Sequence, residues 1–149
     1  MLKNKNGLTW LEVIIITAVL IALFFLAKIG INNAQVKSRD IERIASVKQI
    51  QNALEFYFYH RNQYPVLENV VLGSDNFQVL CDSDLGFQEN GENCDKIFLE
   101  EIISAPNSQS GDSYIYNGGG QNYIISFSLE KGAGGLGAGE HVASEMGIE

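Results

Sequence analysis

The hydrophobic pattern begins with a long apolar run near the N-terminus. Residues 8–27 (LTWLEVIIITAVLIALFFLA) are apolar except for two threonines and Glu12, and lysines lie on both sides of the run. A helix needs about 20 consecutive apolar residues to cross the hydrocarbon core of a membrane, and this run is that long. The pattern therefore predicts a membrane anchor with one acidic residue inside it.

Beyond the anchor the pattern becomes amphipathic. No glycine or proline interrupts residues 37–64, and apolar residues recur at helical spacing on one broad face. These residues are Ile44, Val47, Ile50, Leu54, Tyr57 and Phe58. The anchor helix is expected to continue as a stalk to about Arg61, and the aromatic residues 56–59 are expected to form a seam of the core rather than a ligand platform.

The remaining chain predicts a small head with two clear strands. Tyr114–Tyr116 and Tyr123–Leu129 alternate as strands do, and Asn117–Gly120 lies between them as a turn. In the second strand Ile125, Phe127 and Leu129 share one face, which is expected to cover the helix. The predicted fold class is α+β, with a long N-terminal transmembrane and stalk helix packed under a small antiparallel β-sheet head.

The other parts of the head give weaker patterns. Residues 66–98 are acidic and rich in turn residues, so we expect a surface excursion there. Phe98–Ile103 predicts a short amphipathic segment that ends at Pro106. The glycine-rich run 132–139 lacks the Lys-Ser/Thr ending of a phosphate-binding loop, so it is interpreted as a flexible closing loop.

Charge divides the chain into a basic stalk and an acidic head. The net charge is −8, yet Lys28–Tyr64 is rich in basic residues, whereas Lys96 and Lys131 are the only basic residues from position 65 onward. An acidic surface cannot gain affinity by releasing counterions from phosphates. We therefore expect no nucleic-acid binding through the head.

The ionisable and sulfur-containing side chains of the head predict no catalytic centre. Neither His60 nor His141 has a recognisable partner motif, so both are interpreted as surface or cap residues and the chain as a non-enzyme. Cys81 and Cys94 lack the additional ligands of a metal site. Two alternatives remain for them: a disulfide in an oxidising compartment, or two unpaired thiols.

The acidic residue in the anchor needs an explanation, because a carboxylate inside an apolar span costs several kcal/mol unless it is paired, protonated or near the interface. Thr9 and Glu12 have the Thr-x-x-Glu spacing of a capping box, in which Thr9 is the helix cap. Pairing with a cation is the other explanation. A classical cleaved signal is not favoured, since no small-x-small site follows the run.

The residues around Glu12 resemble a known signal. Residues 3–7 (KNKNG), followed by Leu8-Thr9-Trp10-Leu11-Glu12 and an aliphatic run, resemble the class III signal of type IV prepilins and type II secretion pseudopilins. The resemblance implies cleavage by a prepilin peptidase between Gly7 and Leu8, and methylation of the new terminal amine on Leu8. It also implies an assembly role for Glu12, whose carboxylate would neutralise the terminal amine of a neighbouring subunit.

The resemblance extends to the end of the stalk and has clear departures. The stretch from Lys48 through Tyr64-Pro65 is similar to the helix end of many pilins. The family usually has Phe where Leu8 stands, Trp10 is bulky for its position, and the proline that the family often has in this helix is absent. Related pseudopilins bind calcium in a head loop, so a calcium site remains an alternative to the expectation of no metal or cofactor. Its candidate ligands are Asp82, Asp84, Glu89, Glu92 and Asp95.

The resemblance implies a structural subunit that polymerises through its N-terminal helix into a type IV pilus-like or secretion pseudopilus filament. Residues 1–7 would be the leader peptide, 8–27 the transmembrane anchor, 28–64 the stalk and 65–149 the head. The implied partners are other copies of the chain, the membrane, prepilin peptidase, and indirectly an inner-membrane platform protein and an assembly ATPase.

The implied location is the cytoplasmic membrane, which the chain crosses once with its N-terminus inside and its head extracytoplasmic, and later an extracellular or periplasmic filament. The sequence does not distinguish a major pilin, a minor pilin, a pseudopilin and a DNA-uptake pilin. The alternative function is that of an uncleaved single-pass membrane protein whose acidic extracytoplasmic head binds a ligand. Glu12 would then serve only as a helix cap.

Overall fold

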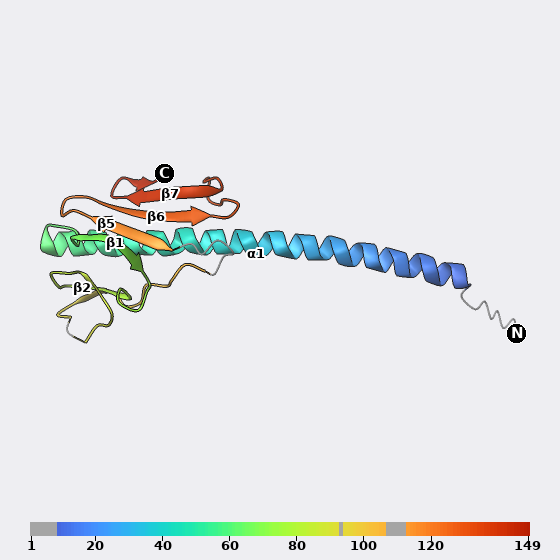
Figure 1. Ribbon diagram of the computed structural model, residues 1–149, viewed down its shortest axis with the longest axis horizontal. Helices are drawn as coiled ribbons and strands as arrows, with labels where there is room; N and C mark the ends of the chain where they lie inside the picture. The colour runs from blue at the N-terminus through green and yellow to red at the C-terminus, as the bar shows by residue number, and fades with distance from the viewer. Residues whose placement is uncertain (1–8, 93, 107–112) are drawn as a thin grey trace, which may run out of the picture. The chain divides into compact units, whose positions relative to one another are not determined.

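The computed structural model describes residues 9–92, 94–106 and 113–149 of the chain. One helix, α1, runs from Trp10 to Arg61 and precedes all the strands (Figure 1). This confirms the prediction of a single helix through anchor and stalk. The chain divides into two compact units, Met1–Gln35 and Val36–Glu149, so α1 contributes to both.

Helix α1 ends where the sequence predicts because its last turn is closed by an asparagine. Asn62 has a φ of 56°, in the left-handed region, and its N–H donates to the carbonyl of Phe58 at 2.7 Å. Asparagine tolerates this conformation at a helix C-terminus better than most residues. Pro65 follows three residues later and prevents the helix from resuming.

The main sheet has five antiparallel strands and lies beside the C-terminal part of α1 (Figure 1). Their order is β1–β5–β6–β7–β8. The strands are β1 (Leu67–Leu72), β5 (Tyr114–Gly118), β6 (Tyr123–Leu129), β7 (Gly139–Ser144) and β8 (Gly147–Ile148). The two predicted strands are confirmed as the hairpin β5–β6, but β5 continues through Asn117 and Gly118, which were expected in the turn, and Gly118 pairs with Tyr123.

A second, smaller sheet corrects the prediction for residues 66–98. Strands β2 (Val79–Cys81), β3 (Phe87–Gln88) and β4 (Ile97–Leu99) form it in the order β3–β2–β4. Strand β1 also lies in this region. The prediction of a surface excursion is wrong, because Leu80, Cys81 and Phe87 are buried. The expected segment Phe98–Ile103 begins inside β4 and continues without regular structure, with Ile102 buried and Ile103 exposed.

The core lies between α1 and the main sheet. Val47, Ile50, Leu54 and Tyr57 of α1 are buried in one cluster with Ile125, Phe127 and Leu129 of β6, which confirms both predicted faces. Burial of each large aliphatic side chain stabilises the fold by about 1.5–3 kcal/mol. The prediction for residues 56–59 is only half right, since Phe56 and Tyr59 remain 63% and 86% exposed.

Tyrosines supply the polar part of this core. The rings of Tyr64 and Tyr123 meet edge-on with centroids 4.7 Å apart, and the hydroxyl of Tyr116 donates to the carbonyl of Pro65 at 2.8 Å. Burial raises the pKa of Tyr64, Tyr116 and Tyr123 well above the ordinary value, and the nearby Glu55 carboxylate adds to the rise for Tyr64 and Tyr123. The fold therefore requires these hydroxyls to stay protonated.

The raised tyrosine pKa values predict a loss of stability in alkali. An unfolded tyrosine ionises near pH 10, whereas the buried ones resist, so the free energy of unfolding should fall as the pH rises above about 10. The measurement is urea unfolding of the full chain in detergent at pH 8 and at about pH 10.5. Tyr123→Phe should reduce the alkaline loss, and Tyr59→Phe, on an exposed ring, is the matched control. A urea midpoint that is the same at both pH values would contradict the prediction.

Candidate functional site

The anchor part of α1 presents an apolar surface that the chain itself does not cover. Every large apolar side chain from Trp10 to Leu26 is exposed in the single chain, in contrast to the buried face from Val47 onward. The helix is long and apolar enough to cross a membrane. An exposed apolar surface of this extent in water is unfavourable, so it needs lipid or protein around it.

Glu12 and Thr9 form a reciprocal capping box at the start of α1. The backbone N–H of Thr9 donates to Glu12 Oε2 at 3.0 Å, and the backbone N–H of Glu12 donates to Thr9 Oγ1 at 3.3 Å. These bonds satisfy N–H groups that have no partner within the helix. The other threonine of the anchor, Thr17, donates its hydroxyl to the carbonyl of Val13 at 2.7 Å.

The structure places the predicted cap as expected, with Thr9 directly before the first helical residue. The predicted cleavage site at Gly7 and Leu8 and the predicted methylation site at Leu8 lie outside the described residues. Glu12 is exposed in the single chain, and a carboxylate in the first turn of a helix also interacts favourably with the helix dipole. The capping box therefore accounts for Glu12 within one chain.

A second charged site fixes α1 to the head. Asp40 and Arg43 have no solvent-exposed surface. The Asp40 carboxylate accepts the backbone N–H groups of Glu130, Lys131 and Gly132 at 2.8, 2.8 and 2.9 Å. Arg43 donates to Asp40 Oδ1 at 3.1 Å, so the buried charge is both paired and hydrogen-bonded. We call Arg39, Asp40, Arg43 and residues 130–132 the clamp.

Glu130 and Arg39 complete the clamp on its outer side. Arg39 binds the Glu130 carboxylate through two hydrogen bonds of 2.8 Å, and Arg43 lies 3.2 Å from the same carboxylate. Gly132 has a φ of 89°, and a Cβ there would collide with the backbone of residues 136 and 137. The run 132–139 is therefore not a free loop at its start, because Asp40 and its own tight turn hold its first residue.

Sequence reasoning missed the clamp because charged residues on a stalk usually face water. A signal was nevertheless present. Positions 40, 43, 47, 50, 54 and 57 continue one another at spacings of three and four, so Asp40 and Arg43 lie on the same helix face as Val47 and Ile50. A charged pair that extends an apolar stripe, followed by a Glu-Lys-Gly turn after a strand, is the pattern that points to it.

The clamp lowers the pKa of both carboxyl groups. Burial alone would raise the pKa of Asp40, but the three backbone N–H groups and Arg43 lower it below its ordinary value. The hydrogen bond from Arg39 is the main cause of the lowered pKa of Glu130. A lowered pKa contributes stability that is present above the unfolded pKa, about 4, and is lost as the pH falls below it.

Asp40→Asn should lower the free energy of unfolding by about 3 kcal/mol, because it removes one of the two carboxylates that pair with the buried Arg43 and turns amide hydrogens toward backbone N–H groups. Urea unfolding at pH 7 measures the loss. The variant should also lose part of the acid sensitivity of the wild type below about pH 4. Glu42→Gln, on an exposed residue of the same helical turn, is the control. Equal stability of Asp40→Asn and Glu42→Gln would contradict this role.

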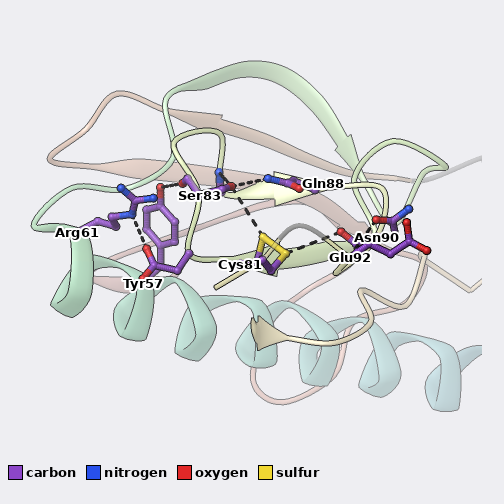
Figure 2. Close-up of a disulfide and its surroundings, with 10 residues drawn as sticks. Tyr57, Arg61, Cys81, Ser83, Gln88, Asn90 and Glu92 are labelled. Atoms are coloured by element: carbon purple, nitrogen blue, oxygen red, sulfur yellow. Dashed lines mark hydrogen bonds and ion pairs between the residues drawn. A yellow bond between two sulfur atoms is a disulfide. The ribbon is translucent and has the colours of Figure 1, made fainter. Parts of the chain in front are cut away.

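The cysteines form a disulfide, which is one of the two alternatives that the sequence left open. Cys81 is joined to Cys94 across a sequence separation of 13 residues. Figure 2 shows Ser83 next to this disulfide, where its hydroxyl accepts Nε2 of Gln88 at 2.6 Å and its carbonyl accepts the Tyr57 hydroxyl at 2.7 Å. The disulfide-closed segment is thus docked on the C-terminal end of α1.

The structure gives the calcium alternative no ligand set. Asp82 and Asp84 both form ion pairs with Arg61 of α1. Across the described ranges no group of three or more histidine, cysteine, aspartate or glutamate side chains gathers to hold a metal. The remaining candidates Glu89, Glu92 and Asp95 therefore do not combine with them into a site.

The histidines have structural surroundings. His60 Nε2 lies 2.8 Å from the Lys96 ammonium, and the His60 ring packs on Phe98 with centroids 5.3 Å apart. The ring nitrogens of His141 lie 2.9 and 3.1 Å from the carbonyls of Gly137 and Glu149. These contacts fit the interpretation of both histidines as surface or cap residues.

Comparisons of the chain with protein-family models, with curated protein sequences and with solved structures find no match. The features of the chain that bear on its function are the anchor, the capping box, the disulfide and the clamp that holds the head.

Proposed function

We propose that this chain is a pilin or pseudopilin, a structural subunit that polymerises through its N-terminal helix into a type IV pilus-like or secretion pseudopilus filament. The observation that carries the proposal is the composition of α1. Between residues 8 and 27 its only ionisable side chain is Glu12, whereas from Val47 onward the same helix forms the inner layer of a folded head. One helix therefore joins a folded head to an apolar segment that its own chain leaves bare.

The bare segment has two partners of suitable chemistry at successive stages. Lipid covers apolar side chains before assembly, and the apolar helices of neighbouring copies cover them afterwards. Neither partner solvates a lone carboxylate, so Glu12 penalises any arrangement that leaves it without a cation. A terminal amine produced by cleavage before Leu8 supplies that cation on the neighbouring copy. This requirement sets the axial register of one subunit against the next.

The capping box is compatible with this sequence of events. It is built from Thr9 and Glu12, so cleavage between Gly7 and Leu8 removes none of its atoms. In the free subunit the Glu12 carboxylate is satisfied by its own backbone. In the filament the other carboxylate oxygen of Glu12 pairs with the terminal amine of the neighbouring copy. Alternatively, the whole carboxylate reaches that amine after a side-chain rotation. Glu12 thus caps the N-terminus of α1 in the free subunit and pairs with a neighbouring copy in the filament.

The Cys81–Cys94 disulfide supports an extracytoplasmic head. Disulfides persist in oxidising compartments and are rare in the bacterial or eukaryotic cytosol. We place the N-terminus on the cytoplasmic side of the cytoplasmic membrane and the head outside, with later incorporation into an extracellular or periplasmic filament. Prepilin peptidase acts on the leader, and a platform protein and an assembly ATPase act on the anchored subunit.

The alternative is an uncleaved single-pass membrane protein with a ligand-binding acidic head. The observation in its favour is the same capping box, because Glu12 already has hydrogen-bond partners in a single chain. The two functions differ in the fate of residues 1–7 and in the effect of the Glu12 charge.

The first prediction from this proposal is a shortened chain. When the protein is purified from membranes of a host with an active prepilin peptidase, its intact mass should lack residues 1–7 and carry one methyl group on Leu8. Expression without the peptidase is the control and should give the full chain. An intact N-terminus in the presence of active peptidase would rule out a processed pilin and leave the uncleaved membrane protein.

The second prediction separates pairing from capping. Glu12→Gln keeps the shape of the side chain but removes its charge, so membrane insertion should be unchanged while incorporation into filaments falls by about tenfold or more. Thr9→Ala, which breaks the box but keeps the carboxylate, should reduce incorporation far less. Quantitative immunoblotting of sheared filaments and membranes measures both. Equal effects of the two substitutions would show that Glu12 acts only as a cap.

A further inference from the structure

The described part of the chain contains two Asn-Gly dipeptides in very different surroundings. Asn90–Gly91 lies between strands β3 and β4, inside the segment that the disulfide closes, whereas Asn117–Gly118 lies in strand β5. A third, Asn6–Gly7, lies outside the described residues. The side-chain amide of asparagine can be attacked by the next backbone nitrogen, and glycine at that next position offers the least steric hindrance.

The Asn90 side chain is exposed and folded back over its own backbone. Its Oδ1 accepts the backbone N–H of Glu92 at 3.2 Å (Figure 2), which draws the side-chain carbonyl toward the chain on the far side of Gly91. Gly91 lies outside both sheets, and a Cβ there would meet only the side chain of Ile97. The attacking nitrogen therefore has little in its way.

Asn117–Gly118 has the same chemistry but a rigid setting. Strand β5 is paired on both sides, with Gly118 opposite Leu67 of β1 and Tyr123 of β6. Gly118 is buried, and a Cβ there would collide with Pro65 and Tyr116. The Asn117 side chain accepts the backbone N–H of Asn69 at 2.8 Å. Asn117 is paired with Ile124 of β6, and Gly118 after it is paired on both sides, so the Asn117 side chain cannot fold onto the Gly118 nitrogen unless the sheet opens.

We propose that Asn90–Gly91 is a self-modification site at which the folded head converts its own asparagine to aspartate and isoaspartate. The backbone nitrogen of Gly91 loses its proton to solvent base and attacks Asn90 Cγ. A new C–N bond closes a five-membered imide, and the side-chain nitrogen leaves as ammonia after taking up a proton. Water then adds to either imide carbonyl and opens the ring to one of the two products.

The surroundings of Asn90 assist the first step. Negative charge develops on Oδ1 as Gly91 attacks, and the N–H of Glu92 already points at this oxygen, in the manner of an oxyanion-binding donor. The backbone N–H of Cys94 donates to the Gly91 carbonyl at 3.3 Å, which holds the turn that brings these groups together. The disulfide anchors the far end of this turn to β2.

The fold tolerates either product. Asn90 is exposed and belongs to no strand, so a new carboxylate at this position remains in water. An isoaspartate lengthens the backbone only within the segment between Cys81 and Cys94, whose ends the disulfide keeps together. The modification adds negative charge to an already acidic head without unfolding it. This inference is independent of the proposed function.

The experiment is an ageing series on the full chain in detergent with the disulfide intact. The protein is incubated near pH 8 and 37 °C, and proteolytic peptides are analysed by mass spectrometry for the conversion of amide to acid. Isoaspartate is measured with an isoaspartyl methyltransferase. Asn90 should react at least about a hundred times faster than Asn117, because strand β5 must open before Asn117 can react. The rate at Asn90 should increase with pH, since the attacking nitrogen must lose a proton.

Three controls make the outcome decisive. Gly91→Ala should suppress the reaction at Asn90, and Gly119→Ala, whose Cβ would make only an ordinary contact with the Asn122 side chain, should leave the rate at Asn90 unchanged. In urea with the disulfide reduced, the two dipeptides should react at similar rates, because the fold no longer distinguishes them. The proposal would be overturned if Asn90 and Asn117 lost their amides at the same rate in the folded protein. It would also be overturned if Asn90 reacted at the wild-type rate in the Gly91→Ala variant.

Discussion

Helix α1 carries two kinds of surface on one backbone, an uncovered apolar segment long enough to cross a membrane and a face packed in the core of the head, and the rest of the structure depends on this constraint. In a membrane every backbone N–H and carbonyl needs a partner within the protein, and a helix provides these partners along its whole length except at its ends. The N-terminal end is closed by the Thr9–Glu12 capping box and the C-terminal end by Asn62 in the left-handed conformation. Between these two caps only the side chains change, from a bare apolar surface to the inner layer of a core.

Two carboxylates of α1, those of Asp40 and Glu12, lie where an unpaired charge is energetically unfavourable, and the chain stabilises them in different ways. Asp40 is permanently buried, and three backbone N–H groups and Arg43 neutralise it inside the same chain. Glu12 sits in an apolar segment but stays exposed, with hydrogen bonds that a side-chain rotation can exchange. The first arrangement is suited to holding a fold together. The second is suited to a group that changes partners.

Much of the helix and two of the five strands of the main sheet could be predicted, because their signals are local. Helical periodicity and Tyr64-Pro65 place the end of α1, and alternation in Tyr123–Leu129 places β6. Strands β2, β3 and β4 are only two or three residues long, so no periodicity reveals them, and their pairing depends on residues distant in sequence. The Thr-x-x-Glu spacing predicts the capping box. The roles of Asp40 and Arg43 were missed, because the clamp partners of Asp40 come from a loop some 90 residues away.

The clamp has a mechanical consequence. Any tension carried along α1 enters the second compact unit at Val36, and the polar contacts of Arg39, Asp40 and Arg43 lie within two helical turns of that point. The Asp40 carboxylate accepts hydrogen bonds from three consecutive residues of a single loop, so a pull on Asp40 acts on all three bonds together. The clamp is therefore placed where a pull on the N-terminal part of α1 would be transmitted to the head.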